Sequence, residues 1–269
     1  MRRVFCHAAH TGLISSGSKG SRRMSSQPSA VLPDHRARLA GVLYLVCIAA
    51  GFSAEFFVRD RIVVYSDAAL TAQNILASPW LYRAGFFADL ISFTSGIIIA
   101  VIFYGLFSPV SRPLARLALT FAIVSNTVSL ASSIFCFAPL QLLGGADYLK
   151  SLSTGQLQSL ALFSLKLYQF AFALNLGLFS IDCLATGYLI FRAQFLPRIL
   201  GVLLAIGGLC YLTSSIAYFL PPRTFPDLFP FIYLPSLVAE LSLALWLTLA
   251  GVNRVRWRAV ADAARGNDG

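Results

Sequence analysis

Charged residues are scarce in this sequence. Asp, Glu, Lys and Arg together make up 12% of its 269 residues, whereas 57% are hydrophobic. Soluble domains carry about 25% charged residues, so a water-soluble globular fold is excluded. The composition instead indicates a protein whose surface faces the lipid bilayer, which makes lipid its main partner.

Histidine is nearly absent, and so are the common catalytic motifs. The three histidines, His7, His10 and His35, all precede the first apolar stretch, which excludes a histidine-ligated metal site within the membrane. No P-loop, H-E-x-x-H or G-x-S-x-G motif occurs, and no serine has an identifiable base partner. We therefore predict no metal, no cofactor and no catalytic residue, and an enzyme is disfavoured.

A continuous basic surface is also lacking. The net charge is +10, but the Lys and Arg residues fall between apolar stretches rather than along one polar face. Nucleic-acid binding needs such a face to contact successive phosphates, so nucleic acid is excluded as a partner. The sequence does not indicate any particular protein partner.

Long apolar stretches are what the sequence has in abundance. Crossing a bilayer takes about 20 residues of helix. Six stretches qualify, at residues 39–57, 84–107, 114–140, 162–191, 199–220 and 232–252. The predicted fold is all-α, a polytopic bundle of six transmembrane helices.

The predicted bundle occupies residues 36–255, between two short terminal segments. The first 33 residues contain five basic and no acidic residues, which predicts that residues 1–35 form a disordered arm. Met24 is an alternative translation start. Residues 256–269 are predicted to form a cytoplasmic tail. Alternate loops hold ten and six basic residues when the arm is left out, so the positive-inside rule places both termini in the cytoplasm.

The first outer loop is predicted to contain a short amphipathic helix. Asp67 stands at a capping position before residues 68–77, and Ser78-Pro79 follows as a stop. Such a helix is expected to lie at the membrane surface. In the second outer loop, Ser153 and Gln156 have capping-box spacing, so the fourth long helix should begin near Thr154.

Four acidic residues lie within the apolar stretches and are the main candidates for function. They are Glu55, Asp89, Asp182 and Glu240. Ionised groups are costly in a bilayer and often mark solute or proton pathways. Counting residues from the span ends places three of them toward the outer side, so we expect one outer-half cavity with Arg59 and Arg83 nearby, lined by Glu55, Asp89 and Glu240.

Small and polar residues recur at helical spacing on several spans. On the second span such a face comprises Gly85, Asp89, Ser92 and Gly96. A stripe on the fourth span joins Asn175 to Asp182, and with Asn126 of the third span these form a weaker candidate site. A small face for close packing is expected on the fifth span from Gly201, Ala205 and Gly208. The same faces can serve helix association alone, and the acids can simply pair with Arg59 or Arg83.

Several segments resemble a bacterial membrane family catalogued as domain of unknown function 4386. The resemblance extends over about residues 36–255 and is most specific from Gly187-Tyr188 to Pro197-Arg198-Ile199-Leu200-Gly201. Further matching segments are Ala54-Glu55-Phe56-Phe57-Val58-Arg59, Arg83-x-Gly85-Phe86-x-x-Asp89-Leu90 and Glu240-Leu241-Ser242-Leu243-Ala244-Leu245-Trp246-Leu247.

The resemblance implies a multi-pass protein of the bacterial cytoplasmic membrane, and it implies no particular activity. The positions that match recurring polar positions of the family are Glu55, Arg59, Asp67, Asn74, Arg83, Asp89 and Glu240. Two departures stand out. Relatives often have an Arg where this chain has Phe121-Ala122-Ile123, and a His near Tyr168 and Asp182. Mechanisms that need those groups do not apply to this chain.

Three functional hypotheses follow. The leading one is a non-enzymatic membrane protein that binds or passes a small solute or protons through the outer-half cavity. The second is an assembly or interaction subunit that docks a partner on residues 67–77. The third is an intramembrane enzyme that modifies lipid.

Overall fold

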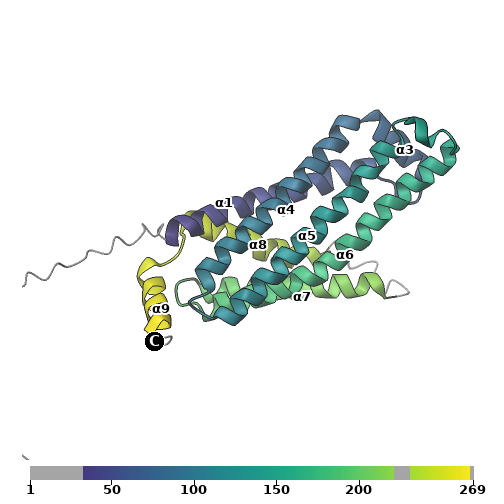
Figure 1. Ribbon diagram of the computed structural model, residues 1–269. Helices are drawn as coiled ribbons and strands as arrows, with labels where there is room; N and C mark the ends of the chain where they lie inside the picture. The colour runs from purple at the N-terminus through teal and green to yellow at the C-terminus, as the bar shows by residue number, and fades with distance from the viewer. Residues whose placement is uncertain (1–32, 221–230, 267–269) are drawn as a thin grey trace, which may run out of the picture. The chain divides into compact units, whose positions relative to one another are not determined.

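The computed structural model describes residues 33–220 and 231–266 (Figure 1). Six helical segments in these ranges are long and apolar enough to cross a membrane. They are Asp34–Ile62, Pro79–Phe107, Arg112–Leu142, Thr154–Arg192, Arg198–Phe219 and Phe231–Leu249. The prediction of an all-α, multi-pass membrane protein is therefore confirmed. The orientation of the termini stays a prediction.

The first span contains a change of helix type. It consists of α1 (Pro33–Phe52), the π-helical turn η1 (Ser53–Arg59) and the short α2 (Asp60–Ile62). The other long helices are α4 (Pro79–Phe107), α5 (Arg112–Leu142), α6 (Thr154–Arg192), α7 (Arg198–Phe219) and α8 (Leu234–Leu249). Shorter elements are α3 (Ala68–Ala77), η2 (Asp147–Leu149), η4 (Phe231–Tyr233) and α9 (Arg254–Gly266). Most of the arm predicted at residues 1–35, with Met24, lies outside the described residues.

The six spans pack as a closed ring. Each long helix packs against the next in the order α1, α4, α5, α6, α7 and α8, and α8 packs back against α1. Both the α6–α7 and α5–α6 interfaces are extensive, and α6 runs beside α5 and α7 in Figure 1. A ring of six helices encloses a central space that side chains must either fill or leave open. This arrangement creates the cavity described below.

Glycines allow α6 and α7 to approach closely. A Cβ atom at Gly187 of α6 would lie 2.8 Å from the carbonyl oxygen of Gly201 and 3.0 Å from the backbone nitrogen of Ala205. Further along the same interface, a Cβ atom at Gly208 would lie 3.1 Å from the carbonyl oxygen of Ser180. Small residues permit this kind of backbone contact between membrane helices. The predicted small face on the fifth span is confirmed.

The predicted helix starts in the two loops are also confirmed. The Asp67 side chain accepts a hydrogen bond from the Leu70 N–H at 2.9 Å and caps α3. Ser153 and Gln156 form a capping box at the start of α6. With 39 residues, α6 is about 58 Å long, so it exceeds a hydrocarbon core of about 30 Å.

One face of α3 is already occupied by the bundle. Its buried residues are Thr71, Ala72 and Ile75, and the helix packs mainly against α6. Thr71 also donates a hydrogen bond to the Val64 carbonyl at 2.9 Å. The apolar side of α3 therefore stabilises this end of the bundle.

The opposite end of the bundle is tied together by a buried carboxylate. Asp34, at the start of α1, forms ion pairs with Arg254 at 2.6 Å and with Arg38 at 3.3 Å. The indole N–H of Trp257 donates a hydrogen bond to the Leu106 carbonyl at 3.0 Å. The segment predicted as a tail thus forms a helix, α9, that is anchored to α1 and α4.

Candidate functional site

The closed ring encloses a cavity of about 1180 Å³ lined by residues of all six spans. Along α4 the lining extends from Asp89 to Phe107, which are 18 residues or about 27 Å apart along the helix. It also reaches Ala115, in the first turn of α5. The cavity is therefore longer than the outer-half cavity expected from the sequence, because the whole ring is open at its centre.

A π-helical turn carries the first pair of polar side chains. In η1 the Asp60 N–H bonds to the Glu55 carbonyl, five residues earlier, in place of the usual four. Such turns are rare and are found frequently at functional sites. Glu55 and Arg59 both belong to this turn and both line the cavity.

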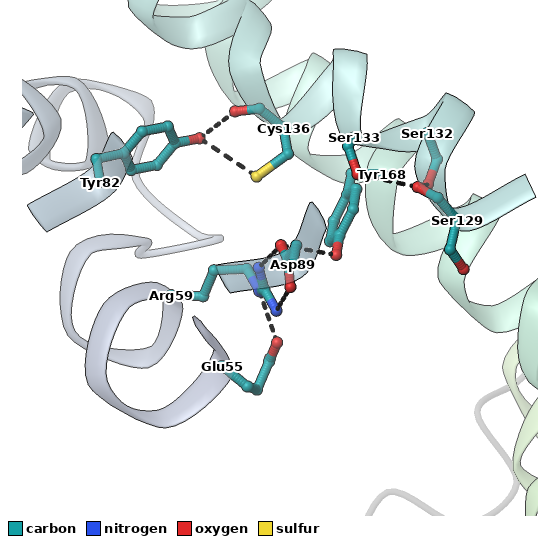
Figure 2. A network of polar contacts seen from close by, with 9 residues as sticks. All are labelled: Glu55, Arg59, Tyr82, Asp89, Ser129, Ser132, Ser133, Cys136 and Tyr168. Carbon is teal, nitrogen blue, oxygen red and sulfur yellow. Dashed lines mark hydrogen bonds and ion pairs between the residues drawn. The ribbon is translucent and has the colours of Figure 1, made fainter. Parts of the chain in front are cut away.

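Arg59 lies between two carboxylates (Figure 2). Its Nε donates to Glu55 at 2.6 Å. Its Nη1 and Nη2 atoms contact the two oxygens of Asp89 at 2.5 Å and 3.3 Å, which is a bidentate geometry. The Arg59 and Asp89 side chains are only 7% and 2% exposed, whereas that of Glu55 is 49% exposed.

Tyr168 of α6 completes this network. Its hydroxyl donates to Asp89 Oδ2 at 3.3 Å, the oxygen that also accepts from Arg59 Nη1. Its ring centroid lies 5.3 Å from the Arg59 guanidinium carbon. That distance is in the range of a cation–π interaction. Figure 2 shows the ring of Tyr168 beside the ion pair, on the side of α5 and α6. The Arg59 network, defined as Glu55, Arg59, Asp89 and Tyr168, therefore joins three spans.

Small residues on α4 allow the first span to come close enough for this contact. A Cβ atom at Gly85 would lie 2.8 Å from Val58 Cγ1, directly before Arg59 in the chain. Two turns along the same face, Ser92 donates to the Cys47 carbonyl at 3.0 Å. From Gly85 to Ser92 the predicted small and polar face of α4 thus packs against η1 and α1, which places Asp89 opposite Arg59, whereas Gly96 lies against Asn126 of α5.

A second group of acidic side chains lies further along the cavity. The Tyr211 hydroxyl of α7 donates to Glu240 of α8 at 2.7 Å, and Tyr44 of α1 interacts with the same carboxylate. Asp182 of α6 accepts a hydrogen bond from Thr186 at 3.0 Å and lies within electrostatic range of Glu240. We call Tyr44, Asp182, Tyr211 and Glu240 the deep acidic cluster.

The two groups are separated along the helices. Tyr168 and Asp182 are 14 residues apart on α6, which corresponds to about 21 Å. Glu240 therefore shares the cavity with Glu55 and Asp89 but does not contact the Arg59 network. It groups instead with Asp182, which the sequence had suggested only as a weaker candidate.

The remaining candidate residues have different surroundings. Asn126 and Asn175 both line the cavity, and Asn126 donates to the Ala122 carbonyl at 2.8 Å. Asn175 Oδ1 is buried and has no hydrogen-bond partner among the described residues. Arg83 is exposed, does not line the described part of the cavity, and places its guanidinium carbon 5.2 Å from the ring centroid of Trp80. Arg83 faces away from the cavity because it lies two residues before Gly85 and therefore outside the face of α4 that packs on η1.

The cavity lining is acidic although the chain is basic. Over the part of the chain that the structure describes, it includes five carboxylates and one basic side chain, that of Arg59. The five are Glu55, Asp60, Asp89, Asp182 and Glu240. Tyr65, in the loop before α3, lines the cavity as well, and burial raises the pKa of its hydroxyl, which therefore stays protonated. The lining thus favours positively charged over negatively charged solutes.

Three tyrosines of the site were missed as site residues by sequence reasoning. Tyr168 does share a helical stripe with Asn175 and Asp182, so its side of α6 could be predicted, but its contact with Asp89 could not. Tyr44 and Tyr211 belong to apolar stretches and gave no comparable signal. Their roles depend on which helices become neighbours in the ring.

Comparison with known proteins gives one result. The family model described as Domain of unknown function (DUF4386) matches residues 39–251. Among curated proteins and among solved structures, nothing matches the chain significantly.

Proposed function

Because the chain belongs to the DUF4386 family, which is described only as a domain of unknown function, we propose a function from its own cavity. The protein binds a small polar or cationic solute there, and Glu55 is the carboxylate that meets the solute at the Arg59 network. The same cavity provides a route for passing the solute or protons, since its lining follows most of α4.

The charge of the Arg59 network carries this proposal. Asp89 neutralises Arg59 through two contacts, and both side chains are buried. Glu55 contacts the same guanidinium, is about half exposed and lines the cavity, so it supplies a carboxylate beyond the one needed to balance Arg59. An excess carboxylate in a largely apolar cavity attracts a cation or a hydrogen-bond donor.

The proposal also covers the membrane in which the protein lies and the orientation of its two sides. The basic side of the chain faces the cytoplasm of a bacterium, and the Arg59 network lies toward the outer surface. The interaction-subunit alternative has less support, because α3 already buries Thr71, Ala72 and Ile75 in the bundle.

Filling the cavity should abolish solute binding. Ala122 of α5 is 4% exposed and lines the cavity, so a phenylalanine in its place would project into the space. We expect solutes that raise the thermal stability of the purified full-length protein in detergent to lose this effect with Ala122→Phe. A panel of amino acids, polyamines, sugars and nucleosides supplies the test compounds.

The matched control for this experiment is Ile134→Phe on the same helix. Ile134 is 70% exposed and is not among the described lining residues, so this variant should respond to solutes like the wild type. Equal responses of Ala122→Phe and wild type to every stabilising solute would mean that binding occurs elsewhere, and the proposal would be rejected.

Neutralising Glu55 should weaken solute binding and leave the fold intact. The Arg59–Asp89 pair remains in Glu55→Gln, so the buried guanidinium keeps its bidentate partner, and glutamine retains the size of Glu55. We expect normal membrane expression together with at least a tenfold weaker solute response in the thermal assay. Solute or proton flux into proteoliposomes, measured in parallel, separates passage from binding. A Glu55→Gln protein with an unchanged response contradicts the assigned role of Glu55.

A further inference from the structure

The deep acidic cluster differs from the Arg59 network in lacking a positive charge. Among the described lining residues Arg59 is the one basic side chain, and its ion pairs are with Glu55 and Asp89. Within residues 33–220 and 231–266, neither Asp182 nor Glu240 forms an ion pair. Both lie well inside their spans, where an unpaired carboxylate is costly. Each of these carboxyl groups is therefore stable either as the neutral acid or beside a positive charge, and the described lining supplies no such charge beside them.

Hydrogen bonds satisfy each carboxylate only in part. Glu240 interacts with the hydroxyls of Tyr211 and Tyr44, and Asp182 accepts from Thr186. A carboxylate has about four lone-pair sites, so acceptor capacity remains on both groups. Both residues line the cavity, so this capacity is available to a molecule inside it.

Another polar group of the cavity lacks a partner within the described ranges. Asn175 is 9% exposed and lines the cavity midway along α6, two turns from Asp182 and two turns from Tyr168, and its Oδ1 atom accepts no hydrogen bond there. A buried amide oxygen without a donor is uncommon in folded proteins. A ligand that carries a hydrogen-bond donor or a positive charge would satisfy it.

The remaining lining is mainly apolar and rich in aromatic residues. Fifteen of the 44 described lining residues are Phe or Tyr, including Phe179 and Tyr211, whose ring centroids lie 5.6 Å apart. Aromatic faces attract organic cations, and quaternary ammonium groups are recognised in this way. A bare metal ion prefers several oxygen ligands, and no group of three His, Cys, Asp or Glu side chains suited to a metal occurs in the described residues. The lining therefore favours an organic cation over an inorganic one.

We propose that the deep acidic cluster binds the charged group of a lipophilic organic cation, whose apolar body lies along the aromatic wall of the cavity. This inference rests on the proposed function, because it uses the same cavity, and it assigns a second ligand class to the part of the cavity that the Arg59 network does not reach. A volume of about 1180 Å³ is ample for a drug-sized molecule, since ligand pockets measure about 300–1,000 Å³. The Arg59 network is about 21 Å further along α6 and is not needed to hold the charge.

Two probes of matched shape and opposite charge test this inference. Tetraphenylphosphonium is a lipophilic cation, and tetraphenylborate is an anion of nearly the same size. Binding of each radiolabelled ion to purified full-length protein is measured in a separate sample by scintillation proximity in nonionic detergent, because the two ions precipitate each other when mixed. We expect saturable binding of the cation and none of the anion. Equal saturable binding of tetraphenylborate, or no saturable binding of the cation, would overturn the inference without any mutant.

Variants then locate the charged group. Glu240→Gln and Asp182→Asn each retain shape and remove one charge, and each should weaken tetraphenylphosphonium binding at least tenfold. Asp147→Asn removes a charge from an exposed loop residue outside the described cavity lining and should bind like the wild type. Size-exclusion chromatography confirms that each variant is folded. Wild-type affinity in both cluster variants would contradict the assignment.

The outcome for Ala122→Phe separates this inference from the proposed function. If neutral solutes bind in an Ala122-dependent manner and tetraphenylphosphonium does not bind, the cavity is a binding site but its ligand is not a lipophilic cation. If tetraphenylphosphonium binds equally well to Ala122→Phe, the cation lies outside the cavity and the inference fails. The proposed function is then judged by its own solute panel.

Discussion

Replacing Arg59 with methionine should destabilise the protein by about 3–5 kcal/mol, the usual cost of removing one partner of a buried ion pair. Asp89 is 2% exposed and, among the described residues, would keep only the hydroxyl of Tyr168 as a polar partner. Glu55 is half exposed, so leaving its carboxylate without Arg59 should cost less free energy than leaving that of Asp89. The measurement is the free energy of unfolding from SDS titration in mixed micelles.

A double-mutant cycle isolates the pair. Arg59→Met, Asp89→Asn and the double variant should give a coupling energy of about 1–3 kcal/mol, because the double variant leaves neither a buried anion nor a buried cation. Lys150→Met removes an exposed partner of Asp147 and should change stability little. Strict additivity of the two single variants would show that the contact between Arg59 and Asp89 contributes no stability.

Replacing Gly187 with leucine should have a comparably large effect. The new Cβ would meet backbone atoms of Gly201 and Ala205 at 2.8 and 3.0 Å, and backbone cannot move aside as a flexible side chain can. Overpacking costs about 1–3 kcal/mol, and we expect the upper end here because α6 and α7 form an extensive helix interface. The readouts are SDS unfolding and the fraction of monodisperse protein on size exclusion.

The control for Gly187 lies on the same helix. Gly155 is in the first turn of α6, and no described atom lies within 4 Å of the point that a Cβ would occupy there, so Gly155→Leu should keep wild-type stability. Loss of stability in both variants would attribute the effect to a leucine on α6 in general. Full stability of Gly187→Leu would mean that α6 and α7 pack less closely than described.

The spans could be predicted because a bilayer imposes a length and a composition on every helix that crosses it. Local signals also sufficed for helix starts, as with Asp67 before α3 and Ser153 before α6. The small face of α7 was predictable for the same reason, since helical spacing fixes which residues share a side. Each of these features depends on residues near one another in the chain.

The acidic candidates were identifiable, but their grouping was not. Counting residues from a span end gives the depth of Glu240 only roughly, and it gives no information on which helices stand beside α8. In the closed ring α8 lies between α1 and α7, so Glu240 meets Tyr44 and Tyr211 instead of Arg59. The same limit explains Arg83, which is near Asp89 in the chain and yet outside the described cavity lining.

By itself, then, the sequence determined that this chain belongs in a membrane, how many apolar spans it has, where α3 and α6 begin and which carboxylates lie within the spans and need a partner. Only the tertiary structure decided which partners they have: Arg59 for Asp89, and two tyrosines for Glu240. The physical reason is one of range. Burial in hydrocarbon acts on each residue through its own position along a helix, whereas the enclosure of a cavity depends on the order in which six helices close into a ring.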